Sequence, residues 1–131
     1  MLDCLIVGDS IAVGTHQARP ECAVWAHSGY NTRQWNQRYS HSQLAAGTVI
    51  ISLGTNDYPG LQTRSELTAI RARVQANRVY WILPAIKPNV QALVREIATQ
   101  HNDVVLPVGS LQADQIHPTR SGYQAIAKAT Q

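Results

Sequence analysis

Continuous apolar segments of strand length are the feature that most limits how this chain can fold. The segment Val79–Leu83 is apolar at every position, and so is Val49–Ile51. Strands buried on both faces have such unbroken runs, and they occur mainly in parallel sheets that helices cover on both sides. Together with the other apolar segments, these runs predict five strands: Leu2–Val7, Cys22–Ala26, Thr48–Leu53, Val79–Leu83 and Val104–Leu106.

Amphipathic patterns between the apolar segments predict helices. Leu67, Ile70 and Val74 fall on one helical face. Thr63 and Glu66 have the spacing of a capping box at the start of that helix. Strands that alternate with helices form βαβ units, so we predict one compact α/β domain over residues 1–131 with a five-stranded parallel sheet. The other expected helices cover Ile11–Arg19, Thr32 to about Ala45, Val90–Ile97 with Pro88 near the first turn, and Tyr123–Ala127.

Composition and charge exclude several classes of protein. The 131 residues suit one domain whose hydrophobic core needs no metal or disulfide. Hydrophobic residues make up 44% and charged residues 15%, so the chain is neither disordered nor dominated by membrane spans. The net charge is only +3 and the arginines are dispersed, so we expect no nucleic-acid partner. Arg64, Arg71 and Arg78 recur at seven-residue spacing and are expected on a solvated helix face.

The start of the chain and its cysteines bear on the cellular compartment. No apolar stretch approaches the ~20 residues that a membrane span needs. Because the first strand is expected to begin at Leu2 and no signal peptide is visible, we expect a cytoplasmic protein. Cys4 and Cys22 have no metal-binding spacing and are expected to be buried thiols. A disulfide between them is sterically feasible if their strands are neighbours.

Small polar residues collect where four of the five expected strands end. In parallel sheets, ligands bind at the carboxyl ends of strands, near the point where the strand order reverses. We expect the strand order 2-1-3-4-5, in which the first and third strands flank that point. The segment Pro84–Pro88, after the fourth strand, is expected to carry little chemistry. The four polar segments are Gly8–Ser10 (GDS), His27–Thr32 (HSGYNT), Gly54–Asp57 (GTND) and Asp114–Thr119 (DQIHPT).

Three residues in these segments have the side chains that acyl transfer requires. A serine nucleophile needs a base, and the base needs an acid that orients it. Ser10 supplies the hydroxyl, His117 can act as the base, and Asp114 can reach the far nitrogen of its imidazole. Pro118 disfavours helical geometry at His117 and therefore favours a fixed turn. Taken alone, Asp114 and His117 are also compatible with an exposed carboxylate and a helix-capping histidine.

N–H groups in the same segments can hold an oxyanion. The candidates are the backbone N–H of Ser10, the backbone N–H of Gly29 and the side-chain amide of Asn56. Gly29 lacks a side chain, so a substrate can approach its N–H closely. The alternatives are an ordinary turn glycine at Gly29 and an Asx-turn at Asn56. Asp9 is expected to cap backbone groups around the Ser10 turn rather than to take part in catalysis.

The four segments, in this order, resemble the signature segments of the SGNH hydrolases, also called GDSL-type esterases and lipases. GTND and DQIHPTRSGY are the most specific parts, and the resemblance spans essentially the whole chain. It implies a three-layer α/β/α, flavodoxin-like fold, with Ser10 as nucleophile and Asp114 and His117 as the rest of the triad. It also implies Gly29 and Asn56 as oxyanion donors beside the Ser10 amide, and no metal or organic cofactor. Members of the family hydrolyse esters and thioesters, often of acyl groups on sugars, lipids or small molecules.

Two departures from the family pattern bear on the substrate. Ile11 stands where leucine is commoner, and the chain is shorter than most members, which leaves little material for a lid. We therefore predict a serine esterase for short acyl groups, acetyl above all, on a small molecule or a carbohydrate. Tyr30 and Tyr58 are candidate substrate contacts. The alternatives are a thioesterase or lysophospholipase-type acyl hydrolase, and a catalytically silent carbohydrate-binding module on the same fold.

Other hypotheses about the same residues fit the sequence less well. A phosphate-binding loop needs four residues between its two glycines and a lysine directly after the second. Here five residues separate Gly8 from Gly14, and no lysine follows Gly14. The five histidines have no zinc-type spacing, so no metal site is expected. Trp25 and Trp81 lie in expected strands, and Trp35 has Tyr39 at i, i+4, so these three tryptophans are expected in the core.

Overall fold

The computed structural model describes residues 1–131 as one five-stranded parallel sheet flanked by five helices. The sheet order is β2-β1-β3-β4-β5, which confirms the predicted order. The strands are β1 (Leu2–Gly8), β2 (Ala23–Ala26), β3 (Leu44–Ser52), β4 (Val74–Ile82) and β5 (Val104–Leu106). The helices are α1 (Ser10–Ala18), α2 (Thr32–Arg38), α3 (Thr63–Arg73), α4 (Pro88–His101) and α5 (Arg120–Ala129).

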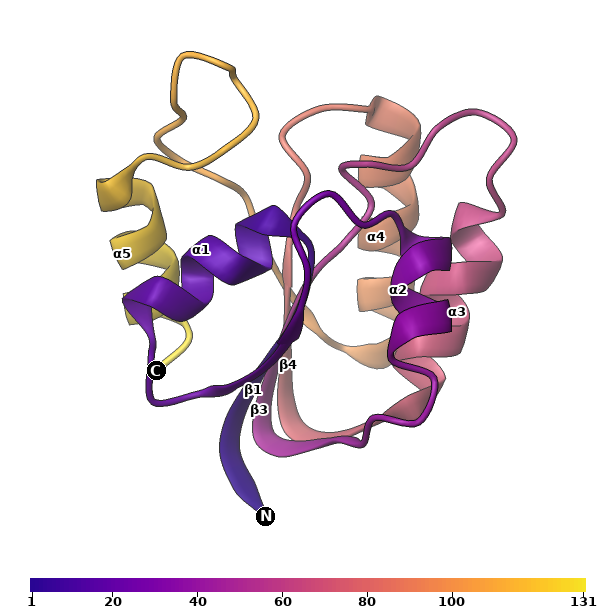
Figure 1. Cartoon of the computed structure of the whole chain (residues 1–131), viewed down its shortest axis with the longest axis horizontal. Helices are drawn as coiled ribbons and strands as arrows, with labels where there is room; N and C mark the ends of the chain where they lie inside the picture. Colours follow the sequence, from indigo (N-terminus) through magenta and orange to yellow (C-terminus); the bar gives the residue numbers. More distant parts are fainter.

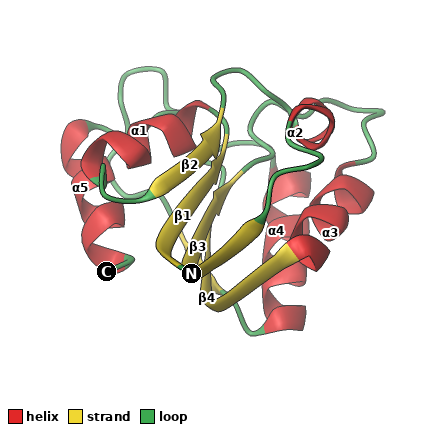
Figure 2. Cartoon of the chain, turned by 60° about the horizontal axis from the view of Figure 1, so that its bottom comes forward, coloured by secondary structure: helices red, strands yellow, loops and turns green.

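The helices lie on both faces of the sheet. Helices α1 and α5 cover one face, and α2, α3 and α4 cover the other (Figure 1). The same three layers are seen when the molecule is turned so that its bottom comes forward (Figure 2). This arrangement confirms the predicted α/β/α architecture. None of the helices is long and apolar enough to cross a membrane.

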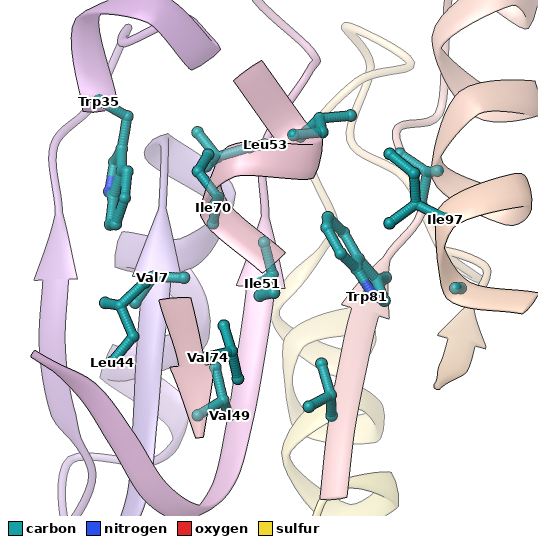
Figure 3. Packing of buried hydrophobic residues seen from close by; sticks show 14 of the residues in the cluster. Val7, Trp35, Leu44, Val49, Ile51, Leu53, Ile70, Val74, Trp81 and Ile97 are labelled. Atoms are coloured by element: carbon teal, nitrogen blue, oxygen red, sulfur yellow. The ribbon is translucent and has the colours of Figure 1, made fainter. Parts of the chain in front are cut away.

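Successive residues of the central strands point into two different cores. In β3, Val49 and Ile51 belong to a core of 19 buried residues, whereas Ile50 belongs to a core of nine. The larger core lies under α2, α3 and α4 and contains the fully buried Trp35 and Trp81 (Figure 3). Each fully buried aliphatic side chain contributes about 1.5–3 kcal/mol of transfer free energy. Because both faces of the strands are buried, their apolar runs are continuous rather than alternating.

Two helix boundaries differ from the prediction. The helix expected from Thr32 to about Ala45 ends at Arg38, and β3 begins at Leu44. The helix that starts at Thr63 ends at Arg73, so Val74 opens β4 instead of continuing the helical stripe. Leu44 and Val74 are paired in the sheet and both are buried. Leu44 and Val74 are therefore in strands because pairing in the sheet buries them, although their local sequence pattern also fits a helix.

The capping box is found on a different helix from the one predicted. Thr63 and Glu66 do not form one, because the Thr63 hydroxyl donates instead to the Asp57 carboxylate. A reciprocal box is present at the start of α2, where Asn31 accepts from the Gln34 N–H and the Gln34 side chain accepts from the Asn31 N–H. The predicted place of Pro88 in the first turn of α4 is confirmed.

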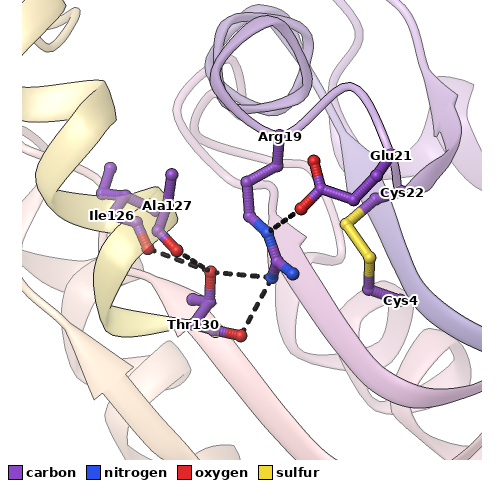
Figure 4. Close-up of a disulfide and its surroundings, with 7 residues drawn as sticks. All are labelled: Cys4, Arg19, Glu21, Cys22, Ile126, Ala127 and Thr130. Carbon is purple, nitrogen blue, oxygen red and sulfur yellow. Dashed lines mark hydrogen bonds and ion pairs between the residues drawn. A yellow bond between two sulfur atoms is a disulfide. The ribbon is translucent and has the colours of Figure 1, made fainter.

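Cys4 and Cys22 form a disulfide, so the prediction of buried thiols is wrong (Figure 4). Their Cα atoms are 4.9 Å apart because Cys4 lies on β1 and Cys22 directly precedes β2, its neighbour. The bond closes a loop that carries Ser10 and all of α1, and a loop of this size gives about 3 kcal/mol of stabilisation. The cytoplasmic location expected above stays a prediction.

The loop closed by the disulfide is also fixed to the end of the chain. The Arg19 guanidinium donates to the backbone and side-chain oxygens of Thr130 and pairs with Glu21 (Figure 4). Cys4, Glu21 and Cys22 are the one cluster of metal-ligating residue types in the chain. Because the two sulfurs are bonded to each other, this cluster offers a metal only a single carboxylate.

Arg64 is exposed on α3 as expected, but three other expected placements of surface and core residues are wrong. Arg71 does not lie on a solvated face, because it pairs with the Asp103 carboxylate, whose side chain is only 3% exposed. Arg78 is on β4 rather than on a helix. Trp25 lies on the edge strand β2 and is 39% exposed, because an edge strand has a neighbour on one side only.

Candidate active site

The predicted site residues lie in loops at the carboxyl end of the sheet. Strand β1 pairs with β2 on one side and with β3 on the other, so the loops that follow these strands are neighbours. The His27 N–H donates to the Gly8 carbonyl and the Asp9 N–H donates to the Ser52 carbonyl, each at 3.0 Å. These two bonds join the Ser10 turn to the loops after β2 and β3.

The sharp turn between β1 and α1 requires glycine at position 8. Gly8 has φ +143°, and a Cβ at this position would lie 1.8 Å from the Ser52 carbonyl oxygen. No L-residue fits such a contact with backbone. Ser10 follows as the first residue of α1, and the Asp9 carboxylate caps this helix by accepting from the Ile11 N–H. The predicted capping role of Asp9 is therefore confirmed.

Ser10, His117 and Asp114 form an unbroken chain of hydrogen bonds. The Ser10 Oγ atom is 2.8 Å from His117 Nε2, and His117 Nδ1 is 2.7 Å from Asp114 Oδ2. The residues come from opposite ends of the sequence but meet because α5 packs against α1. The Asp114 and His117 side chains are 43% and 33% exposed, so the site is open to solvent.

A rigid turn holds the carboxylate against the imidazole. The second oxygen of Asp114 accepts from the His117 N–H at 3.0 Å and from the Ile116 N–H at 2.9 Å. Together with the bond to the imidazole, these backbone bonds lower the pKa of Asp114 to about 2. The turn is closed by a bond from the Gln112 N–H to the His117 carbonyl. Asp114 is therefore ionised throughout the neutral pH range and can hold His117 with its proton on Nδ1.

The three predicted oxyanion donors lie on the loops after β1, β2 and β3. The Asn56 amide donates one N–H to the Tyr30 carbonyl at 3.0 Å, which leaves its second N–H for a ligand. Gly29 has φ +84°, is exposed, and has open space on the side where a Cβ would be. The Ser10 N–H lies in the first turn of α1, where backbone N–H groups have no helical acceptor. Each of the three groups therefore has an N–H without an acceptor in the protein.

Comparisons with solved structures identify the fold. The chain matches a candidate acylhydrolase from Bacteroides fragilis at 17% identity, with TM-score 0.69 over 96% of this chain and 83% of that chain. It matches a candidate GDSL-like lipase from Parabacteroides merdae at 16% identity, with TM-score 0.71 over 97% and 92%. The chain has the fold of GDSL-type acylhydrolases. The resemblance predicted from the motifs is thus confirmed for the fold.

Two further solved structures share the GDSL-type fold. One is the C-terminal catalytic domain of the peptidoglycan O-acetyltransferase A of Streptococcus pneumoniae, at 16% identity and TM-score 0.58 over 97% of this chain and 89% of that domain. The other is an acetyl xylan esterase from Butyrivibrio proteoclasticus, at 12% identity and TM-score 0.55 over 98% of this chain and 61% of that one. No family model and no curated protein matches the sequence.

The two aromatic residues predicted to contact substrate, Tyr30 and Tyr58, lie on the loops after β2 and β3. Tyr30 is half-buried and stacks on the exposed His27, with ring centroids 4.1 Å apart. Tyr58 is 55% exposed and lines a pocket of about 760 Å³ between the loop after β3 and the start of α4. The sequence carries no local signal for this pocket, because α4 is brought to the loop only by the packing of the sheet.

The Asp9 carboxylate is buried directly behind the candidate nucleophile. Its Oδ1 accepts from the Ser52 hydroxyl as well as from the Ile11 N–H, whereas its Oδ2 has no partner. Burial raises the pKa of Asp9 to about 6, which the hydrogen bonds to Ile11 and Ser52 only partly offset. The folded protein therefore binds this proton more tightly than the unfolded chain, in which the pKa is 3.8.

We expect Asp9 to make the protein more stable at acidic than at neutral pH. Its contribution to the free energy of unfolding is fully present below about pH 4 and is lost as the pH rises through 6, a change of up to about 3 kcal/mol. Asp9→Asn keeps the capping oxygen and does not titrate. Urea unfolding from pH 4 to 8 should show that the difference in stability between the two proteins changes with pH. Parallel pH curves for both proteins would contradict this prediction.

Proposed function

We propose that the protein hydrolyses short-chain acyl esters, acetyl esters above all, through an acyl-enzyme formed on Ser10. The observation that carries the proposal is the continuous hydrogen-bonded chain from Ser10 Oγ through His117 to Asp114. A serine hydroxyl so placed can lose its proton to the imidazole as it attacks a carbonyl carbon. An Asp–His pair without a nucleophile at 2.8 Å would not support this chemistry.

The reaction follows from the positions of these groups. His117 Nε2 takes the Ser10 proton as Oγ bonds to the ester carbonyl carbon, and Asp114 stabilises the resulting imidazolium. The tetrahedral oxyanion accepts hydrogen bonds from the N–H groups of Ser10, Gly29 and Asn56. His117 then gives its proton to the leaving alkoxide as the C–O bond breaks. Water, deprotonated by His117, attacks the acyl-serine, and His117 returns the proton to Ser10 Oγ as the C–Oγ bond breaks and the carboxylic acid leaves.

Carbohydrate acetyl esters are the substrate class that we propose. Asp114 and His117 are exposed, so the site can accept a group attached to a large molecule. Tyr30 and Tyr58 are partly exposed on the loops after β2 and β3, and such side chains can contact a sugar ring. Two of the proteins with the same fold are, by name, a peptidoglycan O-acetyltransferase and an acetyl xylan esterase. Both names refer to acetyl groups on polysaccharides.

Covalent labelling of Ser10 tests the proposed function. A serine-reactive fluorophosphonate should add one equivalent to the folded protein, observed as an increase in intact mass, and peptide mapping should place it on Ser10. Ser10→Ala should stay unlabelled, and Ser65→Ala, which changes an exposed serine of α3, should label like the wild type. An unlabelled wild-type protein that binds oligosaccharide would instead support the alternative of a catalytically silent binding module.

A further inference from the structure

We propose that Asp57 and Lys87 are positioning residues that hold the oxyanion donors Asn56 and Gly29 in place. This inference rests on the proposed function and concerns two residues for which the sequence predicts no role of their own. Asp57 is the last residue of the segment Gly54–Asp57, and Lys87 lies in Pro84–Pro88, the segment after the fourth strand that is expected to carry little chemistry. The Lys87 side chain contacts the backbone on both sides of Asn56, and the Asp57 side chain contacts Thr32 and Thr63.

The Asp57 carboxylate joins the loop after β3 to the start of α2. Asp57 is only 2% exposed, and its Oδ1 accepts from the Thr32 N–H at 2.9 Å. Its Oδ2 accepts from the hydroxyls of Thr32 at 2.7 Å and of Thr63 at 2.6 Å. Thr32 is the first residue of α2, so these bonds fix the end of the loop that contains Gly29.

A second link joins the same two loops through Asn56 itself. The Asn56 amide donates to the Tyr30 carbonyl, one residue after Gly29. Residues 56 and 57 are therefore bonded to residues 30 and 32, and two donors on different loops are held as one unit. An oxyanion hole is effective only when its donors are fixed before the reaction, because reorganisation during the reaction would cost much of the electrostatic stabilisation.

Lys87 holds the backbone on both sides of Asn56. Its ammonium group donates to the carbonyl of Thr55 at 2.6 Å and to the carbonyl of Asp57. Lys87 has φ +66°, a left-handed conformation that a residue with a side chain rarely adopts. Such conformations persist where the surrounding structure enforces them, and they cluster at functional sites. The strained backbone and the two bonds together point to a role at the Asn56 loop.

The kinetics of Asp57→Asn and Lys87→Met test this inference. Asparagine keeps the shape of Asp57, but only one of its two terminal atoms can accept hydrogen bonds, whereas both Asp57 oxygens do. Methionine has nearly the length of Lys87 but no ammonium group to donate. With 4-nitrophenyl acetate, each variant should lower kcat by at least tenfold and leave KM within about twofold, because a displaced donor weakens transition-state binding. The acid limb of the pH profile, which reports the base, should not move. Unchanged kcat in folded Lys87→Met or Asp57→Asn protein would overturn the inference.

A double-mutant comparison separates positioning from a general loss of stability. In an Asn56→Ala background, Lys87→Met should lower kcat by less than twofold, because the donor that Lys87 positions is gone. Asp57→Asn should keep part of its effect there, because Asp57 also holds the Gly29 loop through Thr32. Asp103→Asn is the matched control, since Asp103 is a buried carboxylate bonded to Arg71 and Trp81 outside the site. It should lower Tm without changing kcat.

Two further outcomes decide between the inference and the proposed function. A full tenfold loss with Lys87→Met that persists in the Asn56→Ala background would overturn the positioning role while leaving the esterase proposal intact. A wild-type protein that neither hydrolyses acetate esters nor accepts the fluorophosphonate would reject the proposed function itself, and this inference with it. If Asp57→Asn fails to fold, Lys87→Met carries the same test, because the Lys87 side chain lies outside both cores.

Discussion

Ser10→Ala is expected to lower kcat for hydrolysis of 4-nitrophenyl acetate by at least about 10³-fold. The variant lacks the Oγ atom that forms the acyl-enzyme. His117 Nε2, which lies 2.8 Å from this atom in the wild type, then has no hydroxyl to deprotonate. The fold should be unaffected, because the Ser10 side chain is only partly buried and the turn depends on Gly8 and Asp9 instead. Steady-state rates of purified protein, corrected for the spontaneous reaction, give the comparison.

Ser65→Ala is the control for this prediction, because it makes the same change at an exposed position of α3. Its kcat should equal that of the wild type. Circular dichroism and Tm should show that both variants are folded. If folded Ser10→Ala protein retained a tenth or more of the wild-type kcat, Ser10 would not be the nucleophile and the acyl-enzyme mechanism would have to be abandoned.

Asn56→Ala is expected to lower kcat by about 100- to 1000-fold, which corresponds to about 3–4 kcal/mol of transition-state stabilisation. The second N–H of the Asn56 amide is free to bind charge that develops only as the carbonyl is attacked. KM should change little, because the ground-state carbonyl oxygen gains less from the same donor than the oxyanion does. The measurement is kcat and KM for the acetate ester at several substrate concentrations.

Asn36→Ala is the matched control for Asn56→Ala. Asn36 is also a partly buried asparagine whose amide donates to a backbone carbonyl, that of Glu66, but it lies between α2 and α3 away from Ser10. Its kcat should stay at the wild-type value. A raised KM with unchanged kcat in Asn56→Ala would assign Asn56 to ground-state binding and would contradict its role as an oxyanion donor.

The sheet could be predicted from the sequence because burial on both faces leaves a local signal. The runs at Val49–Ile51 and Val79–Leu83 are continuous, and the structure divides their side chains between two cores. The boundaries were less predictable. Leu44 and Val74 fit the helical pattern of their neighbours as well as they fit a strand, and their pairing with each other decides the outcome. Strand pairing between distant residues has no signature within either segment.

The candidate nucleophile, base and acid could be named because each lies in a short segment of unusual composition. The supporting contacts could not. Asp57 meets Thr32 across 25 positions and Lys87 meets Thr55 across 32 positions, and nothing in the local sequence around Lys87 distinguishes it from an ordinary loop lysine. The disulfide was left open for the same reason, since it depends on whether β1 and β2 are neighbours.

The sequence by itself determined the alternation of strands and helices and the chemical types of residue at the strand ends. These are local properties, set by hydrophobic periodicity and by side chains that acyl transfer requires. Only the tertiary structure decided that Ser10 Oγ lies 2.8 Å from His117 Nε2 and that two loops are held together around Asn56. The physical reason is that hydrogen bonds form over about 3 Å, whereas the residues that make them are up to 107 positions apart in the chain. Packing of α5 against α1 and the order of the sheet bring them within that distance.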